Sequence, residues 1–251
     1  GDDPASHIYV EHKNKDCEEC GVFCRTHWID GNFKQDFVIN YVQSLARNHD
    51  IDGILVQLPL PEHMNAAKVL AEIPPEKDVD CFTTVNIGRL YSGDAFLKPC
   101  TPAGVMRLLD EYGIPLSGKH CVILGRSNVV GKPMAQLLLD ENATVTVCHS
   151  KTENLRDICR SADVLISAVG HPGLVTQDMV KDGAVIVDVG MNRNADGKLC
   201  GDCTREAYEA SRFYTPVPGG VGPMTRAMLM QNVMMAAANR RGLDLNYKGE
   251  K

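Results

Sequence analysis

The chain has 251 residues, of which 44% are hydrophobic and 23% are charged, a profile that fits a globular protein with one large or two small domains. Its net charge is −6 with acidic and basic residues interspersed, so it lacks the basic patch or stripe of a duplex-binding protein. No stretch approaches the roughly 20 apolar residues that span a bilayer, and we therefore expect neither nucleic acid nor a membrane as partner.

The first part of the chain predicts helices and one strand. Asp3-Pro4 predicts a helix start, because an acidic N-cap followed by proline at the first helical position is a preferred arrangement, and Gly21 is the expected stop. The apolar run Ile54-Leu55-Val56-Gln57-Leu58 predicts a buried strand, which Pro59-Leu60-Pro61 ends. Further helices are predicted over 34–48, 64–72 and 103–112.

From Lys119 onward the pattern changes to a regular alternation. Short β-branched strands alternate with helices, which predicts βαβ units and a parallel sheet with helices on both faces. The predicted strands are 120–124, 144–148, 163–168 and 184–189, and the helices between them are 131–140, 152–160 and 176–180. A last helix is predicted over 223–240, with Met224, Ala227, Met228 and Met234 on its apolar face.

A glycine-containing turn follows the first of these strands. It reads Gly125-Arg126-Ser127-Asn128-Val129-Val130-Gly131-Lys132-Pro133 and opens a helix. Loop N–H groups and a helix N-terminus can hold a phosphate at such a place. The turn is not G-x-G-x-x-G, so by itself it fits a turn without a ligand equally well.

The end of the second strand favours NADP over NAD. An NAD site places an acid there to accept the ribose 2′-hydroxyl, whereas an NADP site lacks the acid and supplies cations. Here the strand ends Val147-Cys148-His149-Ser150-Lys151, without an acid. Arg126 can meet the 2′-phosphate beside Ser150, because a guanidinium suits bidentate phosphate contact. A solvated loop charge is the alternative for Arg126.

Candidate catalytic side chains occur in the first 80 residues. Ser6, Tyr9 and Lys13 are spaced to share one face of the first helix. Gln57 is an isolated amide in an apolar run near the end of a predicted strand, where open α/β sheets bind ligands; an amide satisfied by the backbone is the alternative. Asp78 and Asp80 follow in a polar loop, for which solvation is the simplest interpretation.

Seven ordered blocks resemble the signatures of methylenetetrahydrofolate dehydrogenase/cyclohydrolases and cover nearly the whole chain. They are Ser6-x-x-Tyr9-Val10-x-x-Lys13-x-Lys15-x-Cys17, Asp52-Gly53-Ile54-Leu55-Val56-Gln57-Leu58-Pro59-Leu60-Pro61, Lys77-Asp78-Val79-Asp80, Lys98-Pro99-Cys100-Thr101-Pro102, Gly125-Arg126-Ser127 to Pro133, Cys148-His149-Ser150-Lys151-Thr152, and Thr215-Pro216-Val217-Pro218-Gly219-Gly220-Val221-Gly222-Pro223-Met224-Thr225. The last block is the most distinctive.

The resemblance implies an α/β fold with two domains and an interdomain cleft. A Rossmann-type parallel-sheet NADP-binding domain is expected over 101–222, and a smaller α/β substrate domain over 1–100, completed by the C-terminal helix 223–251. The implied activity is NADP-dependent oxidation of 5,10-methylenetetrahydrofolate to 5,10-methenyltetrahydrofolate and hydrolysis of that product to 10-formyltetrahydrofolate. A folate substrate and a homodimer are also implied. We expect a cytoplasmic protein, with an organellar form as the alternative because the chain begins with Gly1.

The resemblance also implies roles for individual residues. Lys13 is the catalytic amine, Tyr9 flanks the pterin, Gln57 hydrogen-bonds near Lys13, and Asp80 holds the pterin's amino edge. A lysine whose pKa is lowered by desolvation suits the hydrolytic step, which needs a proton acceptor. Further substrate contacts are implied for Ser6, Leu58, Pro218 and Gly219. Cofactor contacts are implied for Thr101, Gly125, Arg126, Ser127, Val130, Gly131, His149, Ser150 and Gly220.

The chain departs from the family pattern in two places. Members usually have a helix and a strand before the Gly-Asp-Asp-Pro block with which this sequence opens. Cys81 replaces the glycine that commonly follows Asp80, so its side chain could crowd a pterin or require different backbone angles.

Three competing interpretations stay open from the sequence. The first is a zinc site, suggested by Cys17-x-x-Cys20 and Cys200-x-x-Cys203, but nothing in the sequence brings the pairs together, and we expect no metal. The ten scattered cysteines favour reduced thiols over a disulfide framework. The second is a two-domain NADP dehydrogenase of a different small substrate, and the third is a nucleotide-binding module that has lost catalysis.

Overall fold

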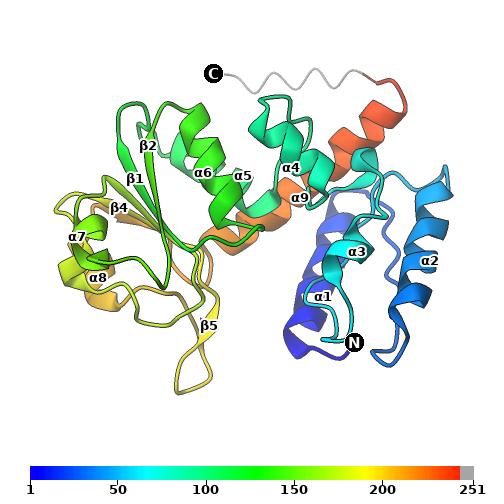
Figure 1. Cartoon of the computed structure of the whole chain (residues 1–251), viewed down its shortest axis with the longest axis horizontal. Coiled ribbons are helices and arrows are strands. Elements are labelled where there is room, and N and C mark those ends of the chain that lie inside the picture. The colour runs from blue at the N-terminus through cyan, green and yellow to red at the C-terminus, as the bar shows by residue number, and fades with distance from the viewer. Residues whose placement is uncertain (244–251) are drawn as a thin grey trace. The chain divides into compact units, whose positions relative to one another are not determined.

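The structure, a computed structural model, describes residues 1–243 and divides into two compact units. Unit 1 comprises Gly1–Lys98 together with the described residues from Arg226 onward, and unit 2 comprises Pro99–Thr225. Figure 1 labels their helices and strands. Within residues 1–243, no helix combines the length and the apolar character needed to cross a membrane.

Unit 1 is built from helices around a small apolar core. Val38 and Val42 of α2 pack there with Ile54, Val69 and Ile73. The elements of this unit are α1 (Pro4–Glu19), α2 (Gln35–Arg47), α3 (Ala66–Leu70), the 3-10 helix η1 (Pro75–Lys77), α4 (Thr84–Tyr91) and most of α9 (Val221–Arg240).

Both ends of α1 follow from the local sequence. The Asp3 carboxylate accepts hydrogen bonds from the Ser6 N–H at 2.8 Å and the Ser6 hydroxyl at 2.7 Å, and Pro4 is the first helical residue. Gly21 follows the C-cap in the left-handed region, with φ of +68°, which glycine adopts without a steric penalty. The predicted start and stop of this helix are confirmed.

The strand predicted over 54–58 is wrong. Only Ile54 forms a bridge, an isolated parallel pairing with Asp78, in which the Ile54 N–H donates to the Lys77 carbonyl at 2.7 Å. An apolar run becomes a strand only beside another strand that accepts its hydrogen bonds. Among the described residues, no strand pairs with 55–58.

Unit 2 contains a five-stranded parallel sheet in the order β2-β1-β3-β4-β7. The central strands β1, β3 and β4 are buried along most of their length, as expected for a parallel sheet covered on both faces. The strands are β1 (His120–Leu124), β2 (Thr144–Cys148), β3 (Val164–Ser167), β4 (Val185–Asp188) and β7 (Phe213–Tyr214), and a separate antiparallel pair is formed by β5 (Asn192–Arg193) and β6 (Leu199–Cys200).

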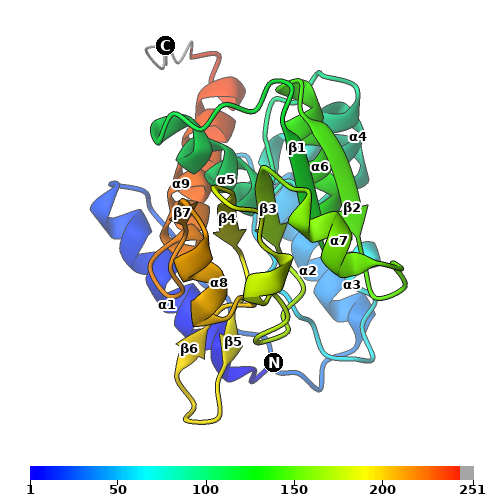
Figure 2. The same ribbon diagram turned by 90° about the vertical axis from the view of Figure 1, so that its left-hand side faces the viewer.

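Helices cover both faces of this sheet. α5 (Cys100–Glu111) and α6 (Gly131–Asp140) lie on one side, whereas α7 (Leu155–Arg160) and α8 (Arg205–Ala210) lie on the other (Figures 1 and 2). The predicted bounds of β1, β2 and α6 are confirmed. The predicted helix 152–160 begins only at Leu155, and the helix predicted over 176–180 is the 3-10 turn η2 (Gln177–Met179).

The strand order places a topological switch point between β1 and β3. The chain proceeds from β1 to the neighbour on one side, β2, and then to the neighbour on the other side, β3. Open α/β sheets bind ligands outside the carboxyl ends of the strands at such a point. The segments that leave β1 at Gly125 and β3 at Ala168 are therefore the candidate ligand-binding loops of unit 2.

Candidate active site

Lys13 and Gln57 are hydrogen-bonded to each other in unit 1. The Lys13 Nζ donates to the Gln57 Oε1 at 3.0 Å, and both side chains are half-buried. The other end of the amide is also engaged, because the Gln57 Nε2 donates to the Leu58 carbonyl at 2.8 Å. These two bonds fix the orientation of the amide and keep its oxygen toward the amine.

Tyr9 lies one helical turn before Lys13 on α1 and is half-buried. Burial raises the pKa of its phenol, and the nearby Arg226 guanidinium offsets part of that rise, so Tyr9 is neutral at pH 7. Arg226 is itself paired with Asp16 at 3.1 Å. Ser6 uses its hydroxyl to bond Asp3 at the start of the helix, so its contribution there is to capping.

Asp78 and Asp80 differ in their surroundings. Asp78 is 1% exposed, and its carboxylate accepts hydrogen bonds from Phe82 N–H at 3.1 Å, Thr83 N–H at 2.8 Å and Asn86 Nδ2 at 3.0 Å. Simple solvation is therefore wrong for Asp78, whose carboxylate organises the start of α4. Asp80, two residues after Asp78, is half-buried.

Cys81 has the backbone conformation that normally calls for glycine. Its φ is +60°, in the left-handed region, and its side chain is fully buried. The thiol donates to the Leu97 carbonyl at 3.2 Å, and burial raises its pKa. Cys81 therefore keeps a backbone angle that suits glycine, and the expectation that it would require a different one is not met.

The segment from Lys77 to Cys81 is anchored on two sides. Lys77 is 2% exposed, and its Nζ donates to the carbonyls of Ala46 and Asn48, each at 2.7 Å, at the C-terminus of α2. Burial lowers the pKa of Lys77, and Arg240 adds to this effect. From α9, the Asn232 Nδ2 donates to the Val79 carbonyl at 2.8 Å.

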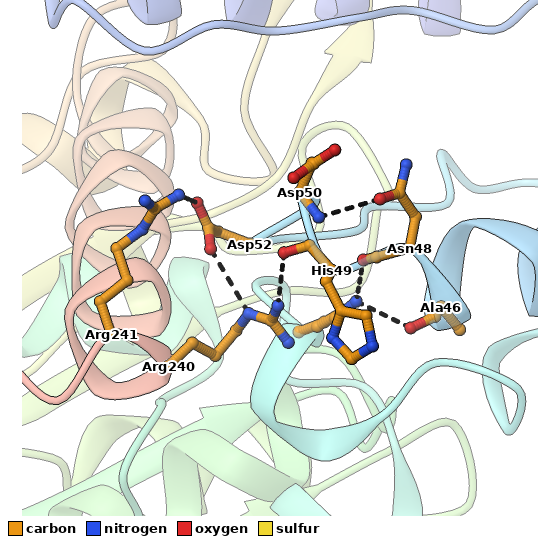
Figure 3. Close-up of polar contacts among 8 residues, drawn as sticks. Ala46, Asn48, His49, Asp50, Asp52, Arg240 and Arg241 are labelled. Carbon is orange, nitrogen blue, oxygen red and sulfur yellow. Dashed lines mark hydrogen bonds and ion pairs between the residues drawn. The ribbon is translucent and has the colours of Figure 1, made fainter.

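A second set of contacts secures the end of α9 to the same region of unit 1 (Figure 3). Asp52 accepts hydrogen bonds from Arg241 at 2.7 Å and Arg240 at 3.4 Å, and Arg240 also donates to the His49 carbonyl at 3.0 Å. Burial opposes ionisation of Asp52, but the bonds from Arg241 and Arg240 outweigh it, so its pKa is lowered.

In unit 2, two glycines shape the turn after β1. Gly125 has φ of +110°, and a Cβ there would lie 2.4 Å from the Ala168 carbonyl oxygen. A Cβ at Gly131 would lie 2.2 Å from the Gly125 oxygen. The Ser127 Oγ accepts from the Val130 N–H at 3.1 Å, which closes the turn. Only glycine fits these two positions, and this close backbone approach at a helix start suits a phosphate.

The end of β2 carries no carboxylate. His149 donates its N–H to Thr152 Oγ1 at 2.9 Å, and its Nδ1 accepts from the Lys151 N–H at 3.1 Å. Ser150 and, after the neighbouring strand β1, Arg126 are exposed. An exposed guanidinium and hydroxyl, without a competing acid at the strand end, fit a nucleotide that carries a 2′-phosphate.

The remaining residues predicted for unit 2 are Thr101 and the Pro218-Gly219-Gly220 segment between β7 and α9. Thr101 on α5 and Thr225 on α9 share a hydrogen bond of 3.0 Å between their hydroxyls. Between β7 and α9, the Val217–Pro218 peptide is cis and Gly219 has φ of +101°. Pro218, Gly219 and Gly220 thus belong to unit 2, whereas Ser6, Tyr9, Lys13, Gln57, Leu58 and Asp80 belong to unit 1.

Two buried aspartates beside the switch point were not found by sequence reasoning. Asp202 accepts four hydrogen bonds, from Ser167 Oγ, Val169 N–H, His171 N–H and Asn192 Nδ2, at 2.8–2.9 Å. Asp188 also accepts four, from three backbone N–H groups and the Tyr208 hydroxyl. The acid that ends the apolar run Val185–Asp188 was the available signal for this pair.

The cysteines do not gather into a metal centre. All ten are free, and Cys17 and Cys20 lie in unit 1 whereas Cys200 and Cys203 lie in unit 2. Across residues 1–243, no three His, Cys, Asp or Glu side chains are grouped so that they could hold a metal ion.

These features define a class: a two-unit α/β protein with a dinucleotide-type sheet and, in the other unit, a lysine–glutamine pair. Residues 1–80 match the family model described as tetrahydrofolate dehydrogenase/cyclohydrolase, catalytic domain. Residues 99–241 match the model for the NAD(P)-binding domain of the same family. The chain belongs to the tetrahydrofolate dehydrogenase/cyclohydrolase family.

Individual relatives agree over nearly the whole chain. The bifunctional protein FolD of Ruminiclostridium cellulolyticum is 51% identical over 97% of this chain and 86% of that protein. The crystal structure of the bifunctional FolD dehydrogenase/cyclohydrolase from Campylobacter jejuni is 48% identical, with a TM-score of 0.93 over 96% of this chain and 86% of that one. The Trypanosoma brucei enzyme, solved in complex with NADP cofactor and inhibitor, is 38% identical, with a TM-score of 0.91 over 95% of this chain and 84% of its own.

Proposed function

We propose that this chain is a bifunctional enzyme that oxidises 5,10-methylenetetrahydrofolate to 5,10-methenyltetrahydrofolate with NADP and then hydrolyses the product to 10-formyltetrahydrofolate. Family membership supports the pair of reactions. The observation that carries the proposal in this chain is the 3.0 Å bond between the Lys13 amine and the Gln57 amide oxygen.

Lys13 serves the hydrolytic step. Water adds to the cationic one-carbon bridge of the methenyl compound, and that addition releases a proton which a base must accept. The neutral Lys13 amine takes this proton. The C–N bond to the pterin nitrogen then breaks as that nitrogen receives a proton and the added hydroxyl loses its own, which leaves the formyl group on the other nitrogen. Gln57 directs the amine, because its own amide is held by the Leu58 carbonyl and cannot turn away.

Asp80 and Tyr9 bind the pterin. The Asp80 carboxylate accepts hydrogen bonds from the pterin's amino edge, and the neutral Tyr9 ring lies against the pterin face. The neighbours of Asp80 hold it in place. Lys77 and Asp78 are buried and hydrogen-bonded, and Asn232 donates to the Val79 carbonyl. These contacts hold the backbone of the segment in one conformation, which lowers the entropy lost on binding.

NADP, when bound, would supply the nicotinamide ring as the acceptor of hydride from the one-carbon bridge. The chain contributes binding and orientation for this step. N–H groups within the turn between Gly125 and Val130 would hold the pyrophosphate, and Arg126 with Ser150 would hold the 2′-phosphate. The absence of an acid at the end of β2, and the NADP complex of the Trypanosoma brucei relative, support NADP. A homodimer, expected from the resemblance, remains a prediction that light scattering can test.

The test is the turnover of Lys13→Met beside that of Lys15→Met. Lys15 lies two residues further on the same helix, is largely exposed and pairs only with Glu19 at 3.7 Å in the described structure, so it is a matched control. Removing the base is expected to slow hydrolysis of the methenyl compound by at least about 100-fold, and the control is expected to keep it. Absorbance of the methenyl compound reports both reactions, with NADP and then with NAD.

Each competing interpretation gives a different result in this assay. Full hydrolytic turnover in Lys13→Met would refute the role of the amine. If the wild-type protein forms no methenyl product with either cofactor, it is an inactive nucleotide-binding module. If it instead reduces NADP with a different small substrate, it is a dehydrogenase of that substrate.

A further inference from the structure

Three cysteines near the end of α1 take no part in the proposed reaction. Cys17 is 5% exposed, whereas Cys20 and Cys24 are exposed. The helix ends at Glu19 and the chain reverses direction at Gly21. The reversal is closed by a hydrogen bond of 2.8 Å from the Val22 N–H to the Cys17 carbonyl.

The reversal brings Cys24 back onto the surface of α1. The Cys24 Sγ donates to the Asn14 Oδ1 at 3.3 Å, and Asn14 is three residues before Cys17, so the two are neighbours on one face of the helix. The Cys24 thiol is close enough to Cys17 to raise the pKa of the Cys17 thiol. On its other side the Cys17 Sγ contacts the Met230 Sδ at 3.9 Å. The Cys17 thiol therefore lies between the interior of unit 1 and the exposed Cys24 thiol.

We propose that Cys17 and Cys24 form a thiol pair that hydroperoxides oxidise to an intramolecular disulfide. Peroxide first oxidises the exposed Cys24 thiol to a sulfenic acid and is itself reduced to water or an alcohol. The Cys17 sulfur then attacks the Cys24 sulfur: the S–S bond forms, the S–O bond breaks, and the departing hydroxyl takes the Cys17 proton to leave as water. Two thiols lose two electrons and two protons in total, and the peroxide accepts them.

Burial assigns different roles to the two sulfurs. Burial raises the pKa of Cys17 to about 12, and contact with Cys24 adds to that rise. A thiol of this kind reacts slowly with an oxidant in solution, because the thiolate is the reactive species. It does not need to meet the oxidant, however, since Cys24 is held by Asn14 on the same face of α1. Cys24 is the first sulfur to react and Cys17 the resolving sulfur.

Cys20 is the competing partner. It is the C-cap residue of α1 and faces solvent, whereas Cys17, three residues earlier, faces Met230. Cys20 raises the pKa of the Cys17 thiol less than Cys24 does. The Cys20→Ser variant is therefore expected to leave the disulfide intact, and it removes the ambiguity between the two exposed sulfurs.

The experiment treats the folded full chain with hydrogen peroxide, blocks the remaining thiols, and maps the product by mass spectrometry. Digestion after Glu19 separates Cys17 from Cys20 and Cys24, so a Cys17–Cys24 disulfide appears as two joined peptides that reduction separates. The joined product is expected in the wild type and in Cys20→Ser, and it is expected to be lost in Cys24→Ser. The oxidised wild type is also expected to melt several degrees higher, because the disulfide constrains the unfolded chain.

Two results would overturn the proposal. One is a joined product that disappears in Cys20→Ser, which would assign the disulfide to Cys20. The other is a Cys24 sulfur that proceeds to sulfinic or sulfonic acid while Cys17 stays a free thiol. Both results are read from the wild type and Cys20→Ser as folded proteins, so a folding defect of Cys24→Ser affects neither of them.

Discussion

Replacing Asp202 by asparagine is expected to destabilise unit 2 strongly. Asp202 is fully buried, and each of its carboxylate oxygens accepts two hydrogen bonds. Asparagine retains one oxygen and replaces the other by an NH2 group. The new group faces either Ser167 Oγ with Val169 N–H, or His171 N–H with Asn192 Nδ2. In the first orientation the Ser167 hydroxyl can turn to accept one amide hydrogen, which leaves the Val169 N–H and the second amide hydrogen without an acceptor.

The size of the effect follows from the two donors left without an acceptor. A buried unsatisfied donor costs about 1–3 kcal/mol, so two of them cost about 2–6 kcal/mol. We expect a loss near the middle of that range, about 4 kcal/mol, in the free energy of unfolding measured in urea. Because Asp202 holds the loop that follows β3 at the switch point, the KM for NADP is also expected to rise.

Asp196→Asn is the matched control, because Asp196 is an exposed acid in the nearby turn between β5 and β6. It removes the same charge without stranding a buried donor, so its effect should stay within about 0.5 kcal/mol. If Asp202→Asn lost less than about 1 kcal/mol, or no more than this control, the hydrogen-bond reasoning would be refuted.

Three further predictions concern charge and backbone space. The pKa of Asp52 in the folded protein lies below its ordinary 3.8, so the stability that its ionised form contributes is present above about pH 4 and is lost as pH falls through the folded pKa. Urea unfolding at pH 7 and pH 3 should therefore show a smaller loss of unfolding free energy on acidification in Asp52→Asn than in the wild type. Gly131→Ala should disrupt the turn after β1 and weaken NADP binding measured by calorimetry, because the new Cβ would lie 2.2 Å from the Gly125 oxygen. The control is Gly88→Ala, whose Cβ would have no atom within 4 Å, and this variant should bind NADP as the wild type does. Arg126→Ala should raise the KM for NADP by about tenfold to a hundredfold and leave that for NAD nearly unchanged; equal changes for both cofactors would contradict the 2′-phosphate contact.

The sheet of unit 2 was predictable because local pattern and tertiary environment agree there. Strands 120–124 and 144–148 and helix 131–140 were predicted with their observed bounds, since apolar β-branched runs bounded by turns have few other uses. Elements too short to show a period were missed: α4, α8, the β5–β6 pair and the two-residue strand β7. Strand β7 exists because β4 accepts its pairing, which local sequence does not contain.

The residues of the candidate site were likewise predictable where the local sequence carries the signal, and not where contacts between distant segments decide their role. The isolated amide Gln57 stood out in its apolar run, and the structure brings it to Lys13 across 44 residues of sequence. The interpretation of Asp78 as solvated failed, because the donors to its carboxylate come from residues further along the chain, which only the turn into α4 brings together. Asp202 was missed for a related reason: its four donors come from two other segments of the chain, residues 167–171 and Asn192.

Unit 1 is discontinuous in sequence, and this affects the order in which the protein can mature on the ribosome. Asn232 supplies hydrogen bonds to Val79 and Lys98, and Arg226 pairs with Asp16, 210 residues earlier. Until α9 has left the exit tunnel, the opening segment of the nascent polypeptide lacks these contacts, whereas unit 2 is one uninterrupted stretch that precedes most of α9. The half that carries Lys13 is therefore the last to be completed during synthesis, and its unfinished apolar surface is what a chaperone would have to shield.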